Sequence, residues 1–597
     1  MSARGTTAPD PAAGAVGRHL SGIAAAPGVA IGPIWRYQPG SGAATAARSA
    51  RTLSIPEAAA IAAEQLEAIA ERVRDAGQGE EAGIFEAQAL MATDPLIVDT
   101  AQRLAHERGS IESAELARAV ADATDTVAAT FAGIEDELLA ARAADVRDVG
   151  ARIGRILRGL EIETPARPSI AIADDLPPSV TVDLPPGSLL GIALESGTRT
   201  SHAAILARGL GIPAALGVTG LLAAVDASSS TTGGPSAGEL LVAVDGEAGV
   251  VILAPGPGEV VALQDRARAS SVDTSAARAL RGQPGTTADG HRVPLLANIG
   301  RPADAQAARA AGAEGVGLFR TEFMFMGRSV EPSEDEQARA YAEVLGQFGH
   351  DDPVVIRLAD IGGDKAIPYL GLPAEANPFL GVRGLLLGYE VARPLLVTQI
   401  RAIARAGAAS GTIPHLMAPM VATVEDVELL LELRAEAFST LDRQGIARSD
   451  RIVTGIMVEV PAAALIADRL ATLVDFFSIG SNDLTQYTLA ADRTNGKLGS
   501  LQDALHPGVL LAIASTVRGA DEAGIPVAVC GELASDPVGA LVLVGLGVDE
   551  LSMEAPALDA VRLRLLGQRR SGLEQLAAAA LAARNAAEVR ALVAALD

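Results

Sequence analysis

The feature that most constrains this fold is a series of eight short apolar segments, spread over residues 284–597. Each segment is followed by a stretch whose apolar residues have helical spacing. Eight β/α units in succession are typical of a (β/α)8 TIM barrel, and their number favours the barrel over the alternative, a doubly wound open sheet. The segments are VPLLANIG, GVGLFRTEF, PVVIRLAD, HLMAPMV, IVTGIMVEV, FFSIGSNDL, PVAVCGEL and ELSME.

A different pattern precedes the barrel. Apolar residues recur at three- and four-residue steps over residues 56–160, which predicts a helical bundle. Strand-like segments lie before this block, from residue 19, and after it, from residue 161. We therefore predict one α/β domain, formed by residues 19–55 and 161–257, into which the bundle is inserted. The strands expected after the bundle are SIAIA, TVDL, LLGIAL, ELLVAVD and GVVILA.

Three further segments complete the expected organisation. Residues 1–18 lack the apolar core of a signal peptide and are predicted to be a disordered tail. Residues 228–238, SSSTTGGPSAG, predict a flexible surface loop. Residues 258–283 are charged and rich in alanine, so we predict a helical linker between the α/β domain and the barrel.

Charge and cysteine content exclude several classes of protein. The net charge of −25 argues against nucleic-acid binding and favours a basic protein partner or a divalent cation. The single cysteine allows no disulfide within the chain, which agrees with a cytoplasmic location. No run of about 18 uncharged apolar residues is present, so we expect no membrane insertion.

Polar side chains collect where the barrel strands are expected to end, which is where barrel enzymes have their active sites. Arginines bind phosphate or carboxylate, and a Glu with an Asp suits a hard cation such as Mg2+. Taken singly, a strand-end arginine can form an ion pair and an aspartate can cap a helix; together they predict a site for a small phosphorylated carboxylate. The residues are Asn298, Arg320, Glu322, Arg357, Asp360, Glu459, Asn482, Asp483, Cys530 and Glu532, with Arg493 one short loop further on.

One histidine has unusual surroundings. His202 follows Gly197, Thr200 and Ser201 at the expected start of a helix, in SGTRTSHAAILARGLGIPAALGV. Neutral imidazole is a good nucleophile near neutral pH, and the N–H groups of a helix start can hold phosphoryl oxygens. An isolated histidine more often caps or packs, so this position alone does not decide between the two roles.

Longer motifs settle the choice. The chain resembles enzyme I of the bacterial phosphoenolpyruvate-dependent sugar phosphotransferase system, the phosphoenolpyruvate–protein phosphotransferases. The resemblance runs in family order from about residue 20 to the end of the chain. The motifs that carry it are SGIAAAPGVAIG, AADVRDVG, TRTSHAAILARGLGIPA, GAEGVGLFRTEFMFM, IRLADIGGDK, NPFLGVRG, VEVPAAA, DFFSIGSNDLTQYTLAADR and CGELASDP.

The resemblance assigns roles to individual residues. It implies that His202 attacks the phosphorus of phosphoenolpyruvate and carries the phosphoryl group. It implies that Cys530 donates the proton that converts the enolate into pyruvate; a thiol is protonated near neutral pH, although a free cysteine can also be a small buried apolar residue. The implied contacts to phosphoenolpyruvate are Arg320, Arg357, Asn482, Asp483 and Arg493, and the implied ligands of Mg2+ are Glu459 and Asp483.

The family also implies partners and movement. The helical bundle is expected to dock the phosphocarrier protein HPr, with Glu80, Glu81 and Glu86 as candidate acidic contacts. The barrel is expected to form a homodimer, and ALVLVGLGV is compatible either with that interface or with a core helix. Because His202 must meet both phosphoenolpyruvate and HPr, the α/β domain is expected to swivel.

Three departures and two alternatives complete the interpretation. Thr198, Leu358 and Leu386 stand where the family usually has glycine, threonine and arginine, and the last of these puts substrate affinity in question. A pyruvate phosphate dikinase or phosphoenolpyruvate synthase would need an ATP-binding module and a glycine-rich phosphate loop, which this sequence lacks. A regulatory protein without catalysis is the other alternative, but the catalytic residues are all present.

Overall fold

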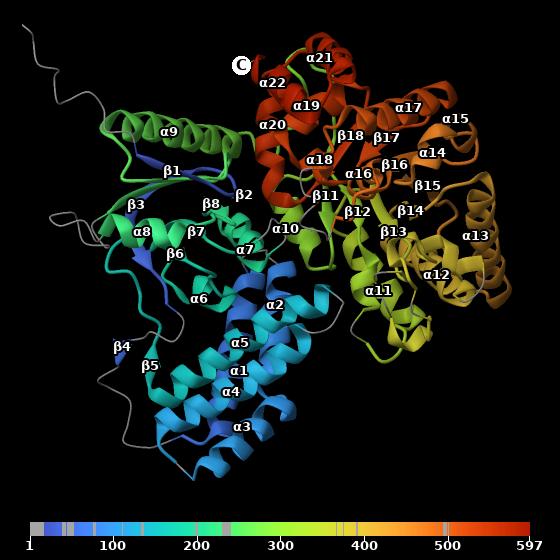
Figure 1. Cartoon of the computed structure of the whole chain (residues 1–597). Coiled ribbons are helices and arrows are strands. Elements are labelled where there is room, and N and C mark those ends of the chain that lie inside the picture. Colours follow the sequence, from blue (N-terminus) through green and yellow to red (C-terminus); the bar gives the residue numbers. More distant parts are fainter. Residues whose placement is uncertain are drawn as a thin grey trace, which may run out of the picture. The chain divides into compact units, whose positions relative to one another are not determined.

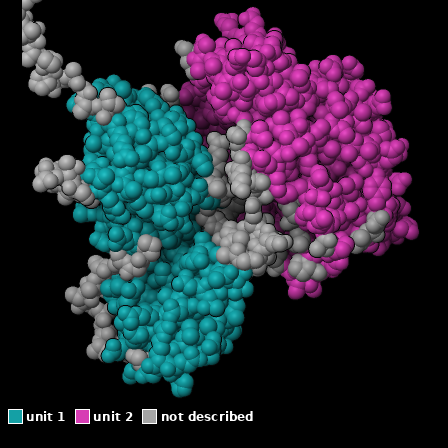
Figure 2. All heavy atoms as spheres, viewed as in Figure 1, with its two compact units in different colours: residues 1–272 teal, residues 273–597 magenta. Residues whose placement is uncertain are grey.

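The computed structural model describes most of the chain as two compact units, residues 1–272 and 273–597 (Figures 1 and 2). Residues 1–16 of the predicted tail and residues 230–238 of the predicted loop lie outside the described residues, whereas Ser228 and Ser229 are helical. The described residues are 17–38, 43–44, 53–75, 79–109, 111–132, 137–197, 201–229, 240–326, 328–363, 365, 367–373, 375–389, 392–493, 498 and 501–596.

The second unit is built around a closed barrel of eight parallel strands. The last strand pairs with the first, with Leu551 opposite Leu295, so no sheet edge remains. This confirms the predicted (β/α)8 barrel and rules out the open sheet. The strands are β11 (Leu295–Ile299), β12 (Val316–Phe319), β13 (Val354–Arg357), β14 (His415–Ala418), β15 (Val453–Val458), β16 (Phe476–Ile479), β17 (Val527–Val529) and β18 (Glu550–Met553).

Side chains of successive residues in these strands face opposite sides, as the pleat requires. Those facing outward join a large core under the surrounding helices, for example Ile356, Ile456 and Phe477. Those facing inward form a separate small core that includes Val355, Met457 and Cys530. The alternation places polar inward-facing residues inside the barrel, where the chemistry is expected.

Helices cover the outside of the barrel. Two of them, α11 and α13, begin with capping boxes at Ser333 and Thr423, which fix their first turns. Most of ALVLVGLGV lies in helix α19, in which residues 539–544 are buried and which packs closely against α21, so this segment is mainly a core helix. The larger helices are α11 (Glu334–Leu345), α12 (Arg393–Ser410), α13 (Val424–Gln444), α16 (Ser481–Leu489), α17 (Pro507–Ala523), α19 (Pro537–Gly545), α20 (Leu558–Leu566), α21 (Arg570–Ala582) and α22 (Ala586–Ala594), with the short helices α10 (Asp304–Ala310), α14 (Pro461–Leu465), α15 (Ala467–Leu470) and α18 (Glu532–Ser535).

The first unit contains one mixed sheet of eight strands, in the order β1-β10-β9-β3-β6-β7-β8-β2. Helices α6 (Pro178–Asp183), α7 (His202–Leu210), α8 (Leu221–Ser229) and α9 (Pro257–Ala279) accompany it. The strands are β1 (Arg18–Ser21), β2 (Ile23–Ala26), β3 (Val29–Arg36), β6 (Ser169–Ala173), β7 (Leu189–Leu194), β8 (Ala214–Leu216), β9 (Leu241–Asp245) and β10 (Val250–Leu253).

One predicted strand in this unit is wrong. TVDL forms the end of helix α6, and its last residue, Leu184, is the C-cap. Pro178 starts that helix at a position where proline fits, because the first helical turn needs no N–H from it. A run of four residues is too short to distinguish a strand from one helical turn.

Five helices occupy the segment between β3 and β6: α1 (Ile55–Asp75), α2 (Gly79–Ala92), α3 (Pro95–Arg108), α4 (Ser113–Ala132) and α5 (Glu137–Arg158). Asp94 and Gly109 cap the two ends of α3, as the turn signals in the sequence indicate. Within the described residues, no helix is both long and apolar enough to cross a bilayer.

The bundle is fixed to the α/β layer by a buried polar cluster and by apolar packing. Asp148 of α5 accepts a hydrogen bond of 2.8 Å from the Ser179 hydroxyl of α6, and the nearby Arg152 pairs with Asp183. Leu206 of α7 is fully buried in the core of the bundle. The helix that begins at His202 is therefore held from the bundle side as well as from the sheet.

Candidate active site

The barrel places the predicted polar residues on one rim, because parallel strands all end on the same side. Arg357 is the last residue of β13, and Arg320 directly follows β12. Glu459 directly follows the strand β15 with Val458 as its last residue, and Asp483 lies in the first turn of α16, just after β16.

Arg357 is the centre of a buried ionic cluster. Its Nη2 donates a 2.6 Å hydrogen bond to Glu322 Oε1 and lies 3.3 Å from Asp360 Oδ2. Burial alone would lower the pKa of Arg357, but Glu322, Asp360 and Glu459 outweigh it and raise the pKa above its ordinary value. The Nε of Arg357 has no hydrogen-bond partner among the described residues, so the guanidinium keeps a donor for a ligand.

A second buried arginine, Arg383, joins this cluster to the carboxylate of Asp483. It grips Asp360 in a bidentate pair, with Nε to Oδ1 at 2.7 Å and Nη2 to Oδ2 at 2.8 Å. The same Nη2 lies 3.2 Å from Asp483 Oδ2, while Lys365 Nζ donates to Asp360 Oδ2 at 2.7 Å. Burial would raise the pKa of Asp360, but Arg357, Arg383 and Lys365 hold it well below its ordinary value, so this carboxylate stays ionised.

Arg383 and Lys365 are the two members of this cluster that the strand-end pattern missed. They lie on the long loop between β13 and α12, in the stretches GGDK and NPFLGVRG. Gly362 brings them together, because it forms isolated β-bridges with both residues. Its φ of +90° requires glycine, and a Cβ at this position would lie only 2.5 Å from the Val382 carbonyl oxygen. The two quoted motifs are the signal that could have found these residues.

Glu459 and Asp483 form the carboxylate pair expected to hold a cation. Glu459 Oε1 accepts a 2.7 Å hydrogen bond from the backbone N–H of Met420. Burial, then Asp483 and Asp360, raise the pKa of Glu459 to about 8. Excess negative charge of this kind is what a bound cation relieves, and oxygen ligands are those that Mg2+ prefers.

The donor set also fits a cation that is shared with a ligand. Within the described part of the chain, no group of three or more His, Cys, Asp or Glu side chains is arranged to hold a metal. Mg2+ is commonly bound by one or two carboxylates together with the oxygens of a phosphorylated substrate. Glu459 and Asp483 would supply the protein's part of such a site.

Cys530 lies inside the barrel just beyond the end of β17. Its thiol is buried and lies 3.6 Å from the carbonyl oxygen of Ile479, and its own carbonyl accepts a 3.0 Å hydrogen bond from Asn298. Burial raises the pKa of the Cys530 thiol to about 11; Glu459 raises it further, while the Ser478 hydroxyl and Arg357 oppose this. The thiol is therefore protonated at neutral pH and able to act as an acid.

The remaining predicted residues lie at the edge of the site. Arg320 is partly exposed and lies 3.6 Å from Glu554. Arg493 pairs with Asp483 at 3.2 Å and lies over the ring of Phe379. Asn482 is turned toward Glu532: its Oδ1 accepts a hydrogen bond from the Glu532 N–H and its Nδ2 donates to the Glu532 carboxylate.

Two of the three departures from the family pattern, Leu358 and Leu386, lie among the described residues. Leu358 is fully buried among the core residues of the barrel, where a threonine hydroxyl would need a partner. Leu386 is half-buried in a short 3-10 helix after Arg383. Thr198 lies outside the described residues.

His202 lies in the other unit, as the first residue of α7. Ser201 occupies the N-cap position, and Gly197, in the loop between β7 and α7, has a φ of +107°. Ala204 and Ala207 of the same helix belong to the apolar core of the sheet, so α7 is packed against it. Thr200 and the side chain of His202 lie outside the described atoms.

Comparisons with known proteins agree with this arrangement. Three family models match in succession: the N-terminal domain of PEP-utilising enzymes over residues 21–142, their mobile domain over 165–249, and their PEP-binding domain over 274–570. Phosphoenolpyruvate-protein phosphotransferases of Geobacillus stearothermophilus and Bacillus subtilis are 40% and 37% identical, and the matches cover 92% of this chain and 93% and 94% of theirs. The chain belongs to the phosphoenolpyruvate–protein phosphotransferase family.

Membership of this family fixes the general activity. The chain is a transferase of the phosphotransferase system that uses phosphoenolpyruvate as its phosphoryl donor. It is also 40% identical to a longer relative, the multiphosphoryl transfer protein of Rhodobacter capsulatus, over 96% of this chain and 67% of that one. A solution structure described as Enzyme I is 28% identical over 42% of this chain, and its TM-score of 0.29 is too low for a comparison of folds.

Proposed function

We propose that this enzyme transfers the phosphoryl group of phosphoenolpyruvate to its own His202, releases pyruvate, and then passes the phosphoryl group to a histidine of the phosphocarrier protein HPr. In this proposal it catalyses the first step of sugar uptake by the phosphotransferase system, in the cytoplasm. The observation that supports it best is the buried cluster around Arg357, which brings a phosphate-binding guanidinium and two carboxylates to the same rim as a protonated thiol.

Phosphoenolpyruvate would bind through the charged residues of the rim. Arg357 and Arg320 would hold the phosphate, with Arg493, Asn482 and Asp483 as further contacts to the substrate. Glu322 and Asp360 hold the Arg357 guanidinium in place before the substrate arrives, so little reorganisation is needed on binding. Mg2+, held by Glu459 and Asp483, would act as a Lewis acid that stabilises negative charge on the transferring and leaving groups.

The leaving group is the enolate of pyruvate, and it must gain a proton on carbon. The Cys530 thiol is the proposed donor, because its raised pKa keeps it protonated and its position inside the barrel shields it from bulk solvent. His202 would attack the phosphorus in line, which requires its ring nitrogen within about 3–3.5 Å of that atom.

HPr would dock on the helical bundle. Leu90 and Leu96, on either side of the turn between α2 and α3, expose 76% and 62% of their surface. Solvent-exposed leucines next to acidic residues suit a partner with an apolar patch and basic surroundings. Of the proposed acidic contacts, Glu86 forms an ion pair with Arg74, whereas the side chains of Glu80 and Glu81 lie outside the described atoms.

Two further parts of the proposal concern the whole chain. We propose that the protein is a homodimer through residues 284–597, which sedimentation of the intact protein at micromolar concentration would test. We also propose that the α/β part, comprising residues 19–55 and 161–257, swivels between the barrel and HPr. Hinges would lie in the linker at 258–283 and at the two ends of the bundle at 56–160.

Incubation with phosphoenolpyruvate labelled in its phosphate tests the function. The protein should take up label with Mg2+ and without ATP, release one pyruvate for each phosphate bound, and deliver the label to added HPr. Label uptake that requires ATP would favour a dikinase. Label uptake that survives removal of Mg2+, or pyruvate formation without uptake, would contradict the proposal.

A further inference from the structure

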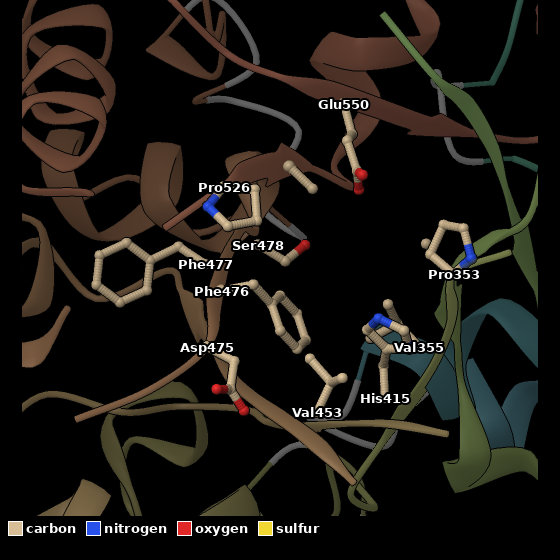
Figure 3. A pocket seen from close by; sticks show the side chains of 12 residues that line it. Pro353, Val355, His415, Val453, Asp475, Phe476, Phe477, Ser478, Pro526 and Glu550 are labelled. Atoms are coloured by element: carbon tan, nitrogen blue, oxygen red, sulfur yellow. The ribbon is translucent and has the colours of Figure 1, made fainter. Parts of the chain in front are cut away.

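A cavity of about 70 Å3 lies inside the amino-terminal half of the barrel, away from the strand ends that carry the candidate site (Figure 3). The residues around it come from the starts of the strands, among them Val355, His415, Val453 and Phe476. The mechanism proposed above uses none of these residues. The cavity is large enough for water, since one molecule needs about 10–15 Å3 of such volume.

Two polar side chains face each other across this cavity. Ser478 of β16 lies opposite Ala528 of β17, which in turn lies opposite Glu550 of β18. Two strand spacings separate Ser478 from Glu550, about 10 Å between backbones. The methyl group of Ala528 leaves the space between them open, and in Figure 3 the Ser478 hydroxyl and the Glu550 carboxylate both point into it.

Ser478 also connects the cavity to the reactive thiol. Ser478 lies opposite Ala528 on the neighbouring strand, two residues before Cys530, and its hydroxyl lowers the pKa of the Cys530 thiol. Among the described residues, the buried Ser478 Oγ has no hydrogen-bond partner. The cavity and the active site are therefore joined at one residue that can both donate and accept a proton.

We propose that Ser478 and Glu550 return a proton to Cys530 from the amino-terminal end of the barrel. This relay rests on the proposed function, because it assumes that Cys530 protonates the enolate. In that step the S–H bond breaks and a C–H bond forms on the methylene carbon, which leaves a thiolate. The thiolate takes the proton of the Ser478 hydroxyl, the hydroxyl takes one from water in the cavity, and that water takes one from the Glu550 carboxyl group. Solvent then restores the proton of Glu550, so each pyruvate consumes one proton from water.

The surroundings of Glu550 suit this role. Burial raises its pKa to about 7, with Asp549 and Glu314 raising it further and Arg292 opposing them. The group therefore exchanges protons readily near neutral pH. His415, a second titratable group of the cavity lining, stays neutral because burial lowers its pKa to about 4. The Asp475 carboxylate lines the cavity as well but points away from Ser478 and Glu550 (Figure 3).

Isotope trapping tests the relay directly. Enzyme equilibrated in tritiated water is mixed with phosphoenolpyruvate and Mg2+ in excess unlabelled water, and the tritium in the methyl group of pyruvate is measured after one turnover. A thiol that exchanges quickly with solvent loses its label before it reacts. We expect Ser478→Ala and Glu550→Gln to trap at least fivefold more tritium than the unaltered enzyme, with equal phosphorylation of His202 in that turnover.

Two variants serve as controls. Glu550→Asp keeps a carboxyl group, so it should trap less label than Glu550→Gln and nearly as little as the unaltered enzyme. If Glu550→Gln acted only by disturbing the structure, Glu550→Asp would trap as much label as Glu550→Gln. Asp475→Asn changes a carboxylate of the same cavity that lies outside the relay, and it should trap as little label as the unaltered enzyme. Thermal unfolding of each variant shows whether it is folded. If Ser478→Ala does not fold, Glu550→Gln still tests the relay.

The outcomes separate the relay from the function on which it rests. If Cys530→Ala traps no label while Ser478→Ala and Glu550→Gln trap the same amount as the unaltered enzyme, the relay is wrong and the role of Cys530 stands. If Cys530→Ala traps as much label as the unaltered enzyme, another group protonates the enolate, and both the proposed role of Cys530 and the relay are wrong.

Discussion

Opposed effects of burial and charge set the chemistry of individual side chains in the barrel. Burial disfavours the charged forms of Arg357, Asp360 and Glu322, yet each stays ionised because the others neutralise it at short range. Cys530 and Glu459 are different, because burial dominates in both and raises their pKa. The site thus has fixed charges that suit the proposed binding of phosphoenolpyruvate and a neutral thiol that suits the proposed proton transfer.

Arg357→Lys tests the fixed charge. A lysine keeps the positive charge but cannot donate to Glu322 and Asp360 while also binding a phosphate in the planar geometry of a guanidinium. We expect about a 100-fold fall in the rate of phosphorylation from phosphoenolpyruvate, the usual cost of one lost transition-state donor. Arg518→Lys, at an exposed position of α17, is the matched control. Equal rates for the two variants would remove Arg357 from the mechanism.

The rate at which the Cys530 thiol is alkylated should increase with pH. With the pKa of Cys530 at about 11 instead of 9.0, its thiolate fraction at pH 8 is about 100-fold below that of an ordinary thiol. Only the thiolate is alkylated, so reaction of the folded protein with iodoacetamide should be slow at pH 8 and increase up to pH 10. The unfolded chain, whose thiol has an ordinary pKa, gives the reference rate. Alkylation of the folded protein at that rate at pH 8 would mean that burial does not raise the pKa of Cys530.

At the scale of elements, the loop between β13 and α12 completes the site. Its turn at Gly362 and Gly363, both with positive φ, folds Lys365 and Arg383 back onto Asp360. The barrel strands supply Arg357, but the loop supplies the positively charged side chains of Lys365 and Arg383. These side chains hold the carboxylates of Asp360 and Asp483 in position. Loop conformation therefore controls the carboxylate that is expected to meet the cation.

Gly362→Ala and Gly371→Ala separate this effect from ordinary backbone strain. Both glycines have positive φ, so alanine costs about 1–2 kcal/mol at either position. Only at Gly362 would the new Cβ collide with backbone, 2.5 Å from the Val382 oxygen, whereas Gly371 has open space. We expect Gly362→Ala to raise the KM for phosphoenolpyruvate at least tenfold and Gly371→Ala to leave it nearly unchanged. The same KM in both variants would show that the loop does not act through its turn.

How much the sequence can predict depends on the length and regularity of each element. Eight apolar segments with helical spacing between them specify a barrel, and the strand-end rule then finds Arg320, Arg357 and Glu459. It does not find Arg383, since nothing in a strand pattern indicates which loop residue folds back. TVDL is wrongly predicted as a strand and β8 is not predicted at all, because three or four residues are too few to show a period.

At the scale of the whole molecule, the chemistry is divided between two compact units. His202 belongs to the first, and Arg357, Glu459, Asp483 and Cys530 belong to the second. A nucleophile must reach the phosphorus to react, and the same imidazole must later meet a protein-sized acceptor. A single position of the His202 imidazole cannot serve both steps. The proposed function therefore needs a movement of the α/β part.

A crosslink that holds the two units together in the state loaded with phosphoenolpyruvate tests this movement. The locked protein should still phosphorylate His202 but should deliver no phosphate to HPr, because the imidazole cannot leave the barrel. Cleavage of the crosslink should restore delivery, which controls for chemical damage. Delivery at the normal rate while the crosslink is intact would rule out the swivel.

The identity of the phosphorylated residue is the most direct test of the proposed function. The protein is mixed with phosphoenolpyruvate and Mg2+, quenched at alkaline pH to preserve phosphohistidine, digested, and analysed by mass spectrometry. We predict phosphate on His202, in an amount equal to the pyruvate released, and no phosphate on any peptide of His202→Ala. Phosphate on a different residue, or pyruvate formed by His202→Ala at the rate of the unaltered enzyme, would contradict the proposed function.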